Sequence, residues 1–255
     1  MENKNSFLLP AIILGLCFIM ATAIGAISFY KAQFLSNVLS VTGSADKIVT
    51  SDTVKWVSTI SRSVDSYNLK EGSSQIKSDL AIVKDYFKKS GIKDSEITVN
   101  PVVMNVVCEN RDGMVWDKYG NQTCGSSMVS GYSLQQTVTV DSAKVSEITA
   151  LSQAVSDYFI GQGLIFTTQS LEYYYSKLAD LRLDLLGEAT KNAKSRADVI
   201  AKSTGKNIGN LQSASMGVFQ ITAKNSVEVS DYGIYDTSSI EKKITAVVRA
   251  SFTLR

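Results

Sequence analysis

The hydrophobic and polar positions of this chain separate one long apolar segment from a much longer part in which the pattern alternates. From Phe7 to Tyr30 there are 24 residues without a charged side chain. At about 1.5 Å per helical residue this segment spans roughly 36 Å, enough to cross a hydrocarbon core of about 30 Å. The pattern predicts a transmembrane anchor over residues 7–30, after a cytoplasmic tail of residues 1–6 and before one extracytoplasmic domain over residues 31–255.

Two other interpretations of the apolar segment stay open. A cleaved signal peptide also has an apolar region, usually of about 7 to 15 residues, and it ends at small residues such as those at 21–23 or 25–26. A lipidated Cys17 is the other interpretation, although Leu16 stands just before it, where a lipoprotein signal has a small residue. The length of the segment favours the uncleaved anchor.

Beyond residue 30 the period of the pattern changes repeatedly between two residues and three to four residues. Alternating apolar and polar residues indicate strands. The expected strands cover residues 38–43, 54–64, 97–107, 129–140, 164–175, 207–223 and 240–254. Apolar residues at three- and four-residue steps indicate amphipathic helices. The expected helices cover residues 71–90, 145–159 and 178–203, and the polar stretch 224–239 is expected to be a loop. This mixture predicts an α+β fold.

The last expected helix carries a small residue at every fourth position. These residues are Ala189, Ala193, Ala197 and Ala201. A ridge of small side chains allows another backbone to approach closely. Packing of the helix on the sheet is the favoured role of this ridge, and a dedicated partner interface is the alternative.

Cys108 and Cys124 bound a 17-residue stretch between two expected strands. A disulfide between them is the expected arrangement; it would contribute roughly 3 kcal/mol in the chain-entropy model and would place the domain in an oxidising compartment. Two unpaired thiols or a two-thiolate metal site are the alternatives, but no further soft ligand is near in the sequence. Trp116 and Tyr119, inside this stretch, are candidate contact residues for a partner, and packing onto the domain is their other interpretation.

Composition narrows the function classes. The hydrophobic share of 44% and the charged share of 20% are those of a globular chain with a core. Beyond residue 30 there are 25 basic and 23 acidic residues, a balance that argues against a nucleic-acid partner. Histidine is absent, which removes the commonest general base and the commonest zinc ligand. The sequence predicts no catalytic residue, no cofactor and no metal site.

Four short stretches, in their order along the chain, resemble the SIMPL domain family of bacterial envelope proteins. They are Val41-Thr42-Gly43; Ser90-Gly91-Ile92 with Ser95-Glu96-Ile97-Thr98; Gly131-Tyr132 at the start of a strand to Val140; and Ala193-Lys194-Ser195-Arg196-Ala197 with Ala201, Gly205 and Ile208-Gly209. The resemblance covers about residues 38–254. It implies an antiparallel sheet with packed helices and a periplasmic or envelope setting, and it implies no active site.

This sequence departs from the family pattern in two places. Ser51-Asp52 stands where the family usually has Pro-Asp, and the stretch bounded by the two cysteines is not a general family feature. The role of that stretch therefore does not follow from the resemblance.

These observations lead to a first hypothesis and an alternative. The first is a non-enzymatic protein of the bacterial inner (cytoplasmic) membrane, held by the single pass from Phe7 to Tyr30, with its domain in the periplasm or outside the cell. It would bind a partner or form a homo-oligomer, and the resemblance implies a link to envelope integrity or oxidative stress. The alternative is an envelope enzyme that uses lysine or carboxylate chemistry without histidine.

Overall fold

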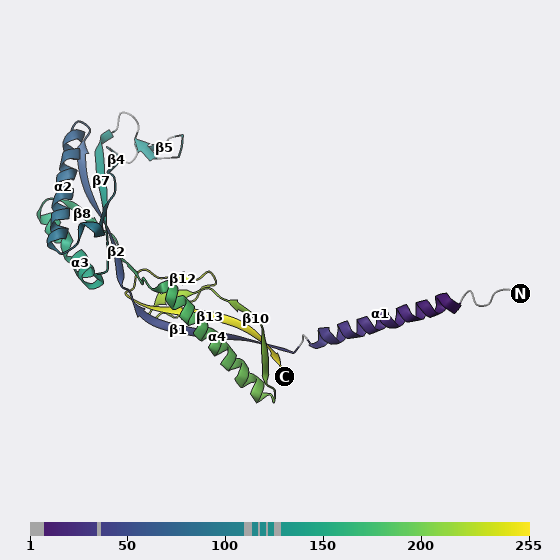
Figure 1. Ribbon diagram of the computed structural model, residues 1–255. Coiled ribbons are helices and arrows are strands. Elements are labelled where there is room, and N and C mark those ends of the chain that lie inside the picture. The colour runs from purple at the N-terminus through teal and green to yellow at the C-terminus, as the bar shows by residue number, and fades with distance from the viewer. Residues whose placement is uncertain (1–7, 35–36, 110–113, 117, 121, 125–128) are drawn as a thin grey trace. The chain divides into compact units, whose positions relative to one another are not determined.

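The computed structural model describes residues 8–34, 37–109, 114–116, 118–120, 122–124 and 129–255. Helix α1 (Leu8–Phe34) comes first (Figure 1). Within it, Pro10–Tyr30 is long and apolar enough to cross a membrane, with a mean hydropathy of 2.4, and none of this segment is buried against the rest of the protein. A membrane anchor and a signal sequence both have these properties, so both interpretations stand.

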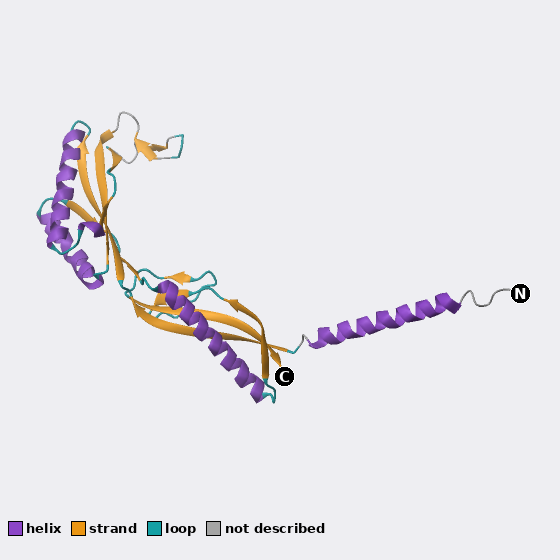
Figure 2. Ribbon diagram, in the orientation of Figure 1, coloured by secondary structure: helices purple, strands orange, loops and turns teal. Residues whose placement is uncertain are grey.

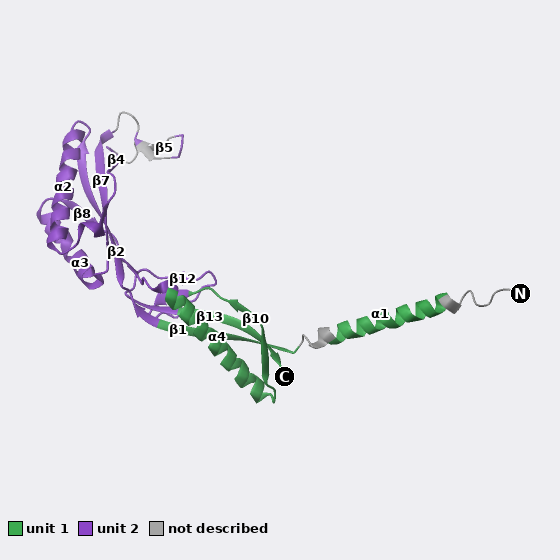
Figure 3. Ribbon diagram, in the orientation of Figure 1, with its two compact units in different colours: residues 1–47, 180–219, 245–255 green, residues 48–179, 220–244 purple. Residues whose placement is uncertain are grey.

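The chain, α1 included, divides into two compact units, shown in different colours in Figure 3. Unit 1 contains residues up to Lys47, Asp180–Phe219 and Thr245–Arg255, and unit 2 contains Ile48–Ala179 and Gln220–Ile244. The sequence led us to expect one domain over residues 31–255. Each unit draws on segments that are far apart in the sequence, and a periodicity pattern does not record which segments pack together.

Unit 2 is built on a six-stranded sheet. Its elements in chain order are β2 (Thr53–Asp65), α2 (Leu69–Lys89), the short 3-10 helix η1 (Asp94–Glu96), β3 (Ile97–Val99), β4 (Val103–Cys108), β5 (Met114–Trp116), β6 (Gln122–Cys124), β7 (Val129–Ser142), α3 (Val145–Gly161), β8 (Ile165–Thr168) and β9 (Glu172–Tyr174). In the six-stranded sheet the strand order is β3-β7-β2-β8, with β4 also paired with β7 and β9 with β2. Strands β5 and β6 form a separate two-stranded sheet. All of these pairings are antiparallel, which confirms the expected kind of sheet.

One face of this sheet carries the core of unit 2. Helices α2 and α3 lie on the same side of β2 and β7 in Figure 2. The alternation of β2 sends Val54, Trp56 and Ile60 to that face, where all three are fully buried. An aromatic cluster fills the space under the helices, with the ring centroid of Trp56 5.1 Å from that of Phe87. The helical spacing of apolar residues in α2 and α3 is therefore explained by this one buried face.

Unit 1 contains β10 (Ile208–Met216) and most of α4 (Leu178–Ser203), β1 (Val38–Thr50) and β13 (Glu241–Leu254). The complete five-stranded sheet has the order β1-β13-β11-β12, with β10 paired with β13. Strands β11 (Gln220–Ala223) and β12 (Ile234–Tyr235) belong to unit 2 and pair in parallel. These elements confirm the α+β class, and the two-residue parallel pairing is the departure from a purely antiparallel arrangement.

The alanine ridge lies in the core of unit 1. Its four members are fully buried or nearly so, and Ala193 and Ala197 pack with Val41, Ala250 and Phe252. A Cβ added at Gly43 would lie 2.3 Å from the carbonyl oxygen of Ala189. Strand β1 and helix α4 thus touch backbone to backbone, as a ridge of small residues allows.

Four predicted element boundaries differ from those of the structure. The expected strand at 164–175 is two strands, because three residues between β8 and β9 face only two residues of β2, which is a bulge. The expected strand at 207–223 is divided into β10 and β11 around Gly217. The expected loop at 224–239 contains the short strand β12, and the first strand runs on to Thr50.

Candidate interaction surface

Strand β4 forms an open edge of the six-stranded sheet in unit 2. It pairs with β7 on one side, from Val103 opposite Gln135 to Cys108 opposite Val129. No other strand in the described part of the chain pairs with its second side. Its sequence, Val-Met-Asn-Val-Val-Cys, has no charged residue, although edge strands are commonly protected by charges.

The side chains of this edge are also apolar and accessible. Met104 is 51% exposed and Val106 is 45% exposed, and both lie on the same side of the sheet as α2 and α3 because they pair with Leu134 and Tyr132. Val103 and Val107 are exposed on the opposite side. An apolar strand with an unpaired backbone edge is the usual template for the addition of a strand from another chain.

A disulfide joins the end of β4 to a small hairpin. Cys108 and Cys124 are bonded with a Cα–Cα distance of 5.7 Å, so the predicted disulfide is present. Cys124 ends β6, which pairs with β5 and also contacts β4. The hairpin is therefore held beside the open edge by a covalent bond.

The hairpin carries the two aromatic residues that the sequence singled out. Trp116, at the end of β5, is 70% exposed, and Tyr119, in the turn, is 76% exposed. The Nζ atom of Lys118 lies 4.9 Å from the centre of the Tyr119 ring. Both rings thus have the exposure that a contact role needs, while the role itself stays a prediction.

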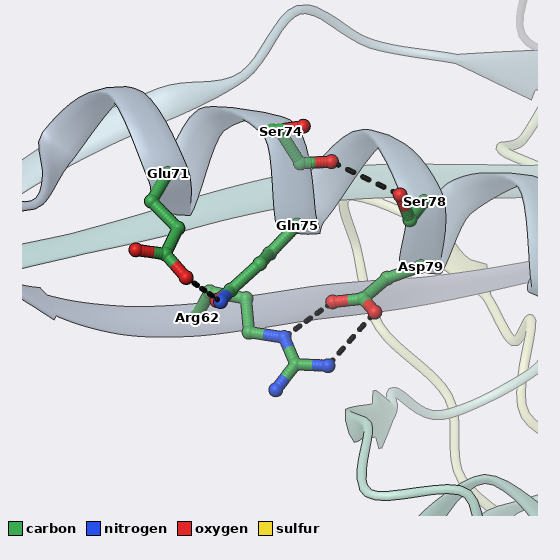
Figure 4. Close-up of polar contacts among 6 residues, drawn as sticks. All are labelled: Arg62, Glu71, Ser74, Gln75, Ser78 and Asp79. Atoms are coloured by element: carbon green, nitrogen blue, oxygen red, sulfur yellow. Dashed lines mark hydrogen bonds and ion pairs between the residues drawn. The ribbon is translucent and has the colours of Figure 1, made fainter.

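An ion pair joins β2, the strand on the far side of β7 from β4, to helix α2, which covers the sheet (Figure 4). Arg62 of β2 donates two hydrogen bonds to Asp79 of α2, one of them from Nη2 to Oδ1 at 2.8 Å. The hydrogen bonds that Arg62 donates to the Asp79 carboxylate raise the pKa of Arg62. Nearby on α2, the Gln75 amide donates to Glu71 at 3.3 Å. The side chain of Asp79 is almost fully buried, so this contact holds α2 in one position on the sheet.

A second buried charge pair lies elsewhere in unit 2. Lys242 is 2% exposed, and its Nζ donates to the carbonyl oxygen of Asp236 at 2.6 Å. Burial alone would raise the pKa of Asp236, but hydrogen bonds from Ser239 and Ser238, with the charge of Lys242, lower it to about 2. Burial lowers the pKa of Lys242. The adjoining hollow holds only about 10 Å³, roughly the space of one water.

A wider groove in unit 2 runs past Asp52 and the start of α3, with a volume of about 330 Å³. Burial opposes the ionisation of Asp52, but hydrogen bonds from Ser176 and Thr53 outweigh it and lower the pKa of this carboxyl. Lys144, on the other wall, donates to the carbonyl oxygen of Gly91 at 3.0 Å. The charged groups of this groove are thus already engaged by the protein.

Sequence reasoning identified part of this surface. It placed the disulfide and the exposed aromatic residues, but it gave β4 no role. The signal was present, because residues 102–107 contain five large apolar residues and no charge. The buried ion pairs of Asp79 and Lys242 gave no signal, since their partners lie elsewhere in the sequence. Among the described residues, no three acidic or cysteine side chains gather as they would around a metal ion.

Comparison with known proteins gives one family. The model described as "SIMPL: Protein of unknown function (DUF541)" matches residues 39–252, from β1 through nearly all of β13. No protein of curated function matches the chain.

Proposed function

The chain belongs to the SIMPL (DUF541) family, and from this premise we propose that it is a membrane-anchored envelope protein that acts by binding another chain at the β4 edge. In this proposal α1 holds the protein in the bacterial inner membrane by a single pass. Both units lie in the periplasm or outside the cell. The role is non-enzymatic. In the cell, the protein supports envelope integrity or tolerance to oxidative stress.

The open edge of β4 is the observation that carries the proposal. A partner strand would satisfy backbone groups that no other described strand binds, and it would cover Met104 and Val106. Trp116 on the adjacent hairpin would add a large contact area with few rotatable bonds. The disulfide supports a location in an oxidising compartment, because such bonds persist there.

A second copy of this chain is the first partner to test. An uncharged strand can pair with its own copy in antiparallel orientation without bringing like charges together. Size-exclusion chromatography with light scattering on residues 31–255, with the disulfide intact and after reduction, would measure the mass. Pro10–Tyr30 is not buried in the structure, so we expect the strands and helices from Val38 onward to fold without residues 1–30.

Variants at the edge make the test specific. We expect a defined oligomer that the double change Met104→Lys and Val106→Lys converts to a monomer. The control Leu183→Lys on α4, also a large exposed apolar residue, should leave the mass unchanged. A wild-type monomer would reject self-association, and binding to other envelope proteins at β4 would then be tested by photo-crosslinking from position 106.

The alternative function is catalysis by a lysine, and one observation favours it. Lys242 is buried and its pKa is lowered, as a lysine base requires. Its amine is bonded to Asp236, and the space beside it admits no substrate larger than water. Envelope hydrolase activity that disappears in Lys242→Met, while the fold is retained, would support this alternative over the binding role.

A further inference from the structure

No helix of the described residues of unit 2 covers the face of the six-stranded sheet opposite α2 and α3 (Figure 2). We call it the open face. Its side chains are those that alternate with the buried residues of β2 and β7. Directly paired residues share one face, so the register places them in cross-strand rows. The three central rows are Thr98, Thr139 and Val57; Thr137, Thr59 and Thr167; and Val103, Gln135, Ser61 and Ile165.

The protein's described residues make no hydrogen bond to the polar side chains of these rows. Seven residues in them carry a hydroxyl or an amide, namely Thr59, Ser61, Thr98, Gln135, Thr137, Thr139 and Thr167. Within the described structure, none of these seven side chains forms a hydrogen bond, and none is sealed away from solvent. The hydroxyl-bearing members can each donate one hydrogen bond and accept others. The open face therefore presents a regular array of available donors and acceptors, with strands about 4.8 Å apart.

The array is electrically neutral. Its charged neighbours lie at the ends, where Lys55 is paired with Glu172 at 3.4 Å and stands opposite Asp141. At the other end Asp65 follows the last rows. A polyanion would need several unpaired cations on this face, and a peptide strand would need free backbone groups, which the interior of a sheet lacks. The chemistry that fits is a neutral ligand rich in hydroxyl groups.

We propose that the open face binds a neutral polysaccharide chain, laid across the rows of threonine. The hydroxyl and amide groups of Thr59, Thr137 and Gln135 would exchange hydrogen bonds with sugar hydroxyls. Val57 and Ile165, together with the threonine methyl groups, would contact the apolar C–H faces of the sugar rings. This site uses side chains on the face, whereas the proposed partner site uses the backbone edge of β4, so the two can fail separately.

The test uses the full chain in lipid nanodiscs, with empty nanodiscs as the blank. Two probes are measured by biolayer interferometry: a hexamer of β-1,4-linked N-acetylglucosamine and a hexamer of β-1,4-linked glucose. We expect saturable binding of at least one hexamer. The double change Thr59→Val and Thr137→Val removes two hydroxyls at nearly constant shape, and should weaken binding by about tenfold. The control pair Ser213→Ala and Ser215→Ala removes exposed hydroxyls from β10 and should have no effect.

Several results would overturn this proposal. They are the failure of both hexamers to bind, an equal affinity in the wild type and the double valine variant, or a change of oligomeric state in place of a change in sugar binding. If the double variant does not fold, Thr167→Val at the exposed strand β8 provides the same test with a smaller expected loss of about threefold. Loss of the oligomer but retention of sugar binding in the Met104→Lys and Val106→Lys variant would show that the two sites are distinct.

Discussion

Arg62 on β2 and Asp79 on α2 form a two-hydrogen-bond ion pair in which the carboxylate is almost completely buried. The two residues lie 17 positions apart, and the pair joins the central strand of the six-stranded sheet to the helix that covers it. A buried carboxylate without its partner cannot recover its hydration. The contact therefore fixes the position of α2 more than it adds to net stability.

Removal of one member of this pair should be costly. We expect Arg62→Met to lower the free energy of unfolding by about 3 kcal/mol, because it leaves Asp79 buried and unpaired. The double change Arg62→Met and Asp79→Leu should recover much of this loss. Urea unfolding followed by circular dichroism would measure both variants. The exposed pair of Asp85 and Lys89 on the same helix is the control, and Asp85→Ala should cause no measurable change.

Two glycines of unit 1 should respond oppositely to the same substitution. Gly43→Ala should destabilise the protein by about 2 kcal/mol or more, because the new methyl group would meet the backbone of Ala189 and Ala193. Gly187 lies on helix α4 with open space around it. Gly187→Ala should therefore stabilise the protein by about 0.5–1 kcal/mol. Thermal unfolding of the two variants in one buffer would compare them. Equal melting temperatures would contradict the close approach of β1 to α4.

Acid should weaken the folded state through Asp236. Its pKa of about 2 in the folded protein lies below the ordinary value of 3.8, so the unfolded chain binds the proton more readily. The stabilisation is complete above about pH 4 and is lost as the pH falls toward 2. Lys242 stays protonated across this range and adds no slope of its own. Asp236→Asn should flatten this part of the stability curve, measured by urea unfolding between pH 2 and 5.

The disulfide should stabilise the hairpin that it closes. Cys108 and Cys124 have a sequence separation of 16, so the loss of their disulfide should cost roughly 3 kcal/mol in the chain-entropy model. Cys108→Ser with Cys124→Ser should make the hairpin sensitive to limited proteolysis before the sheet unfolds. Cys17→Ser, which changes an exposed and unpaired cysteine of α1, is the matched control. Cleavage at the same rate in both variants would mean that the disulfide does not hold the hairpin.

The first 30 residues should remain on the mature protein. An uncleaved anchor predicts that the intact mass includes residues 1–30, and that detergent, but not alkaline carbonate, releases the protein from membranes. A mass that begins after residue 21 or later would show a cleaved signal sequence. That result would leave unit 2, with the edge of β4 and the open face, unchanged.

Particular residues show where sequence reasoning succeeded. The apolar segment of Pro10–Tyr30, the helices and the alternating face of Val54, Trp56 and Ile60 were all predicted, because one periodicity specifies each of them. The disulfide was predicted from two cysteines in a short stretch. The family was recognised from ordered short stretches, and the family match over residues 39–252 confirms it.

The tertiary structure alone decided which segments meet. Asp79 has the polarity of a surface residue, and only its position against β2 makes it a buried ion pair. The unpaired edge of β4 and the rows of threonine on the open face exist because distant strands pair in one register. Local periodicity follows from the geometry of a single helix or strand, whereas an edge, a row or a buried charge depends on contacts between segments, and these are set by the packing of the whole unit.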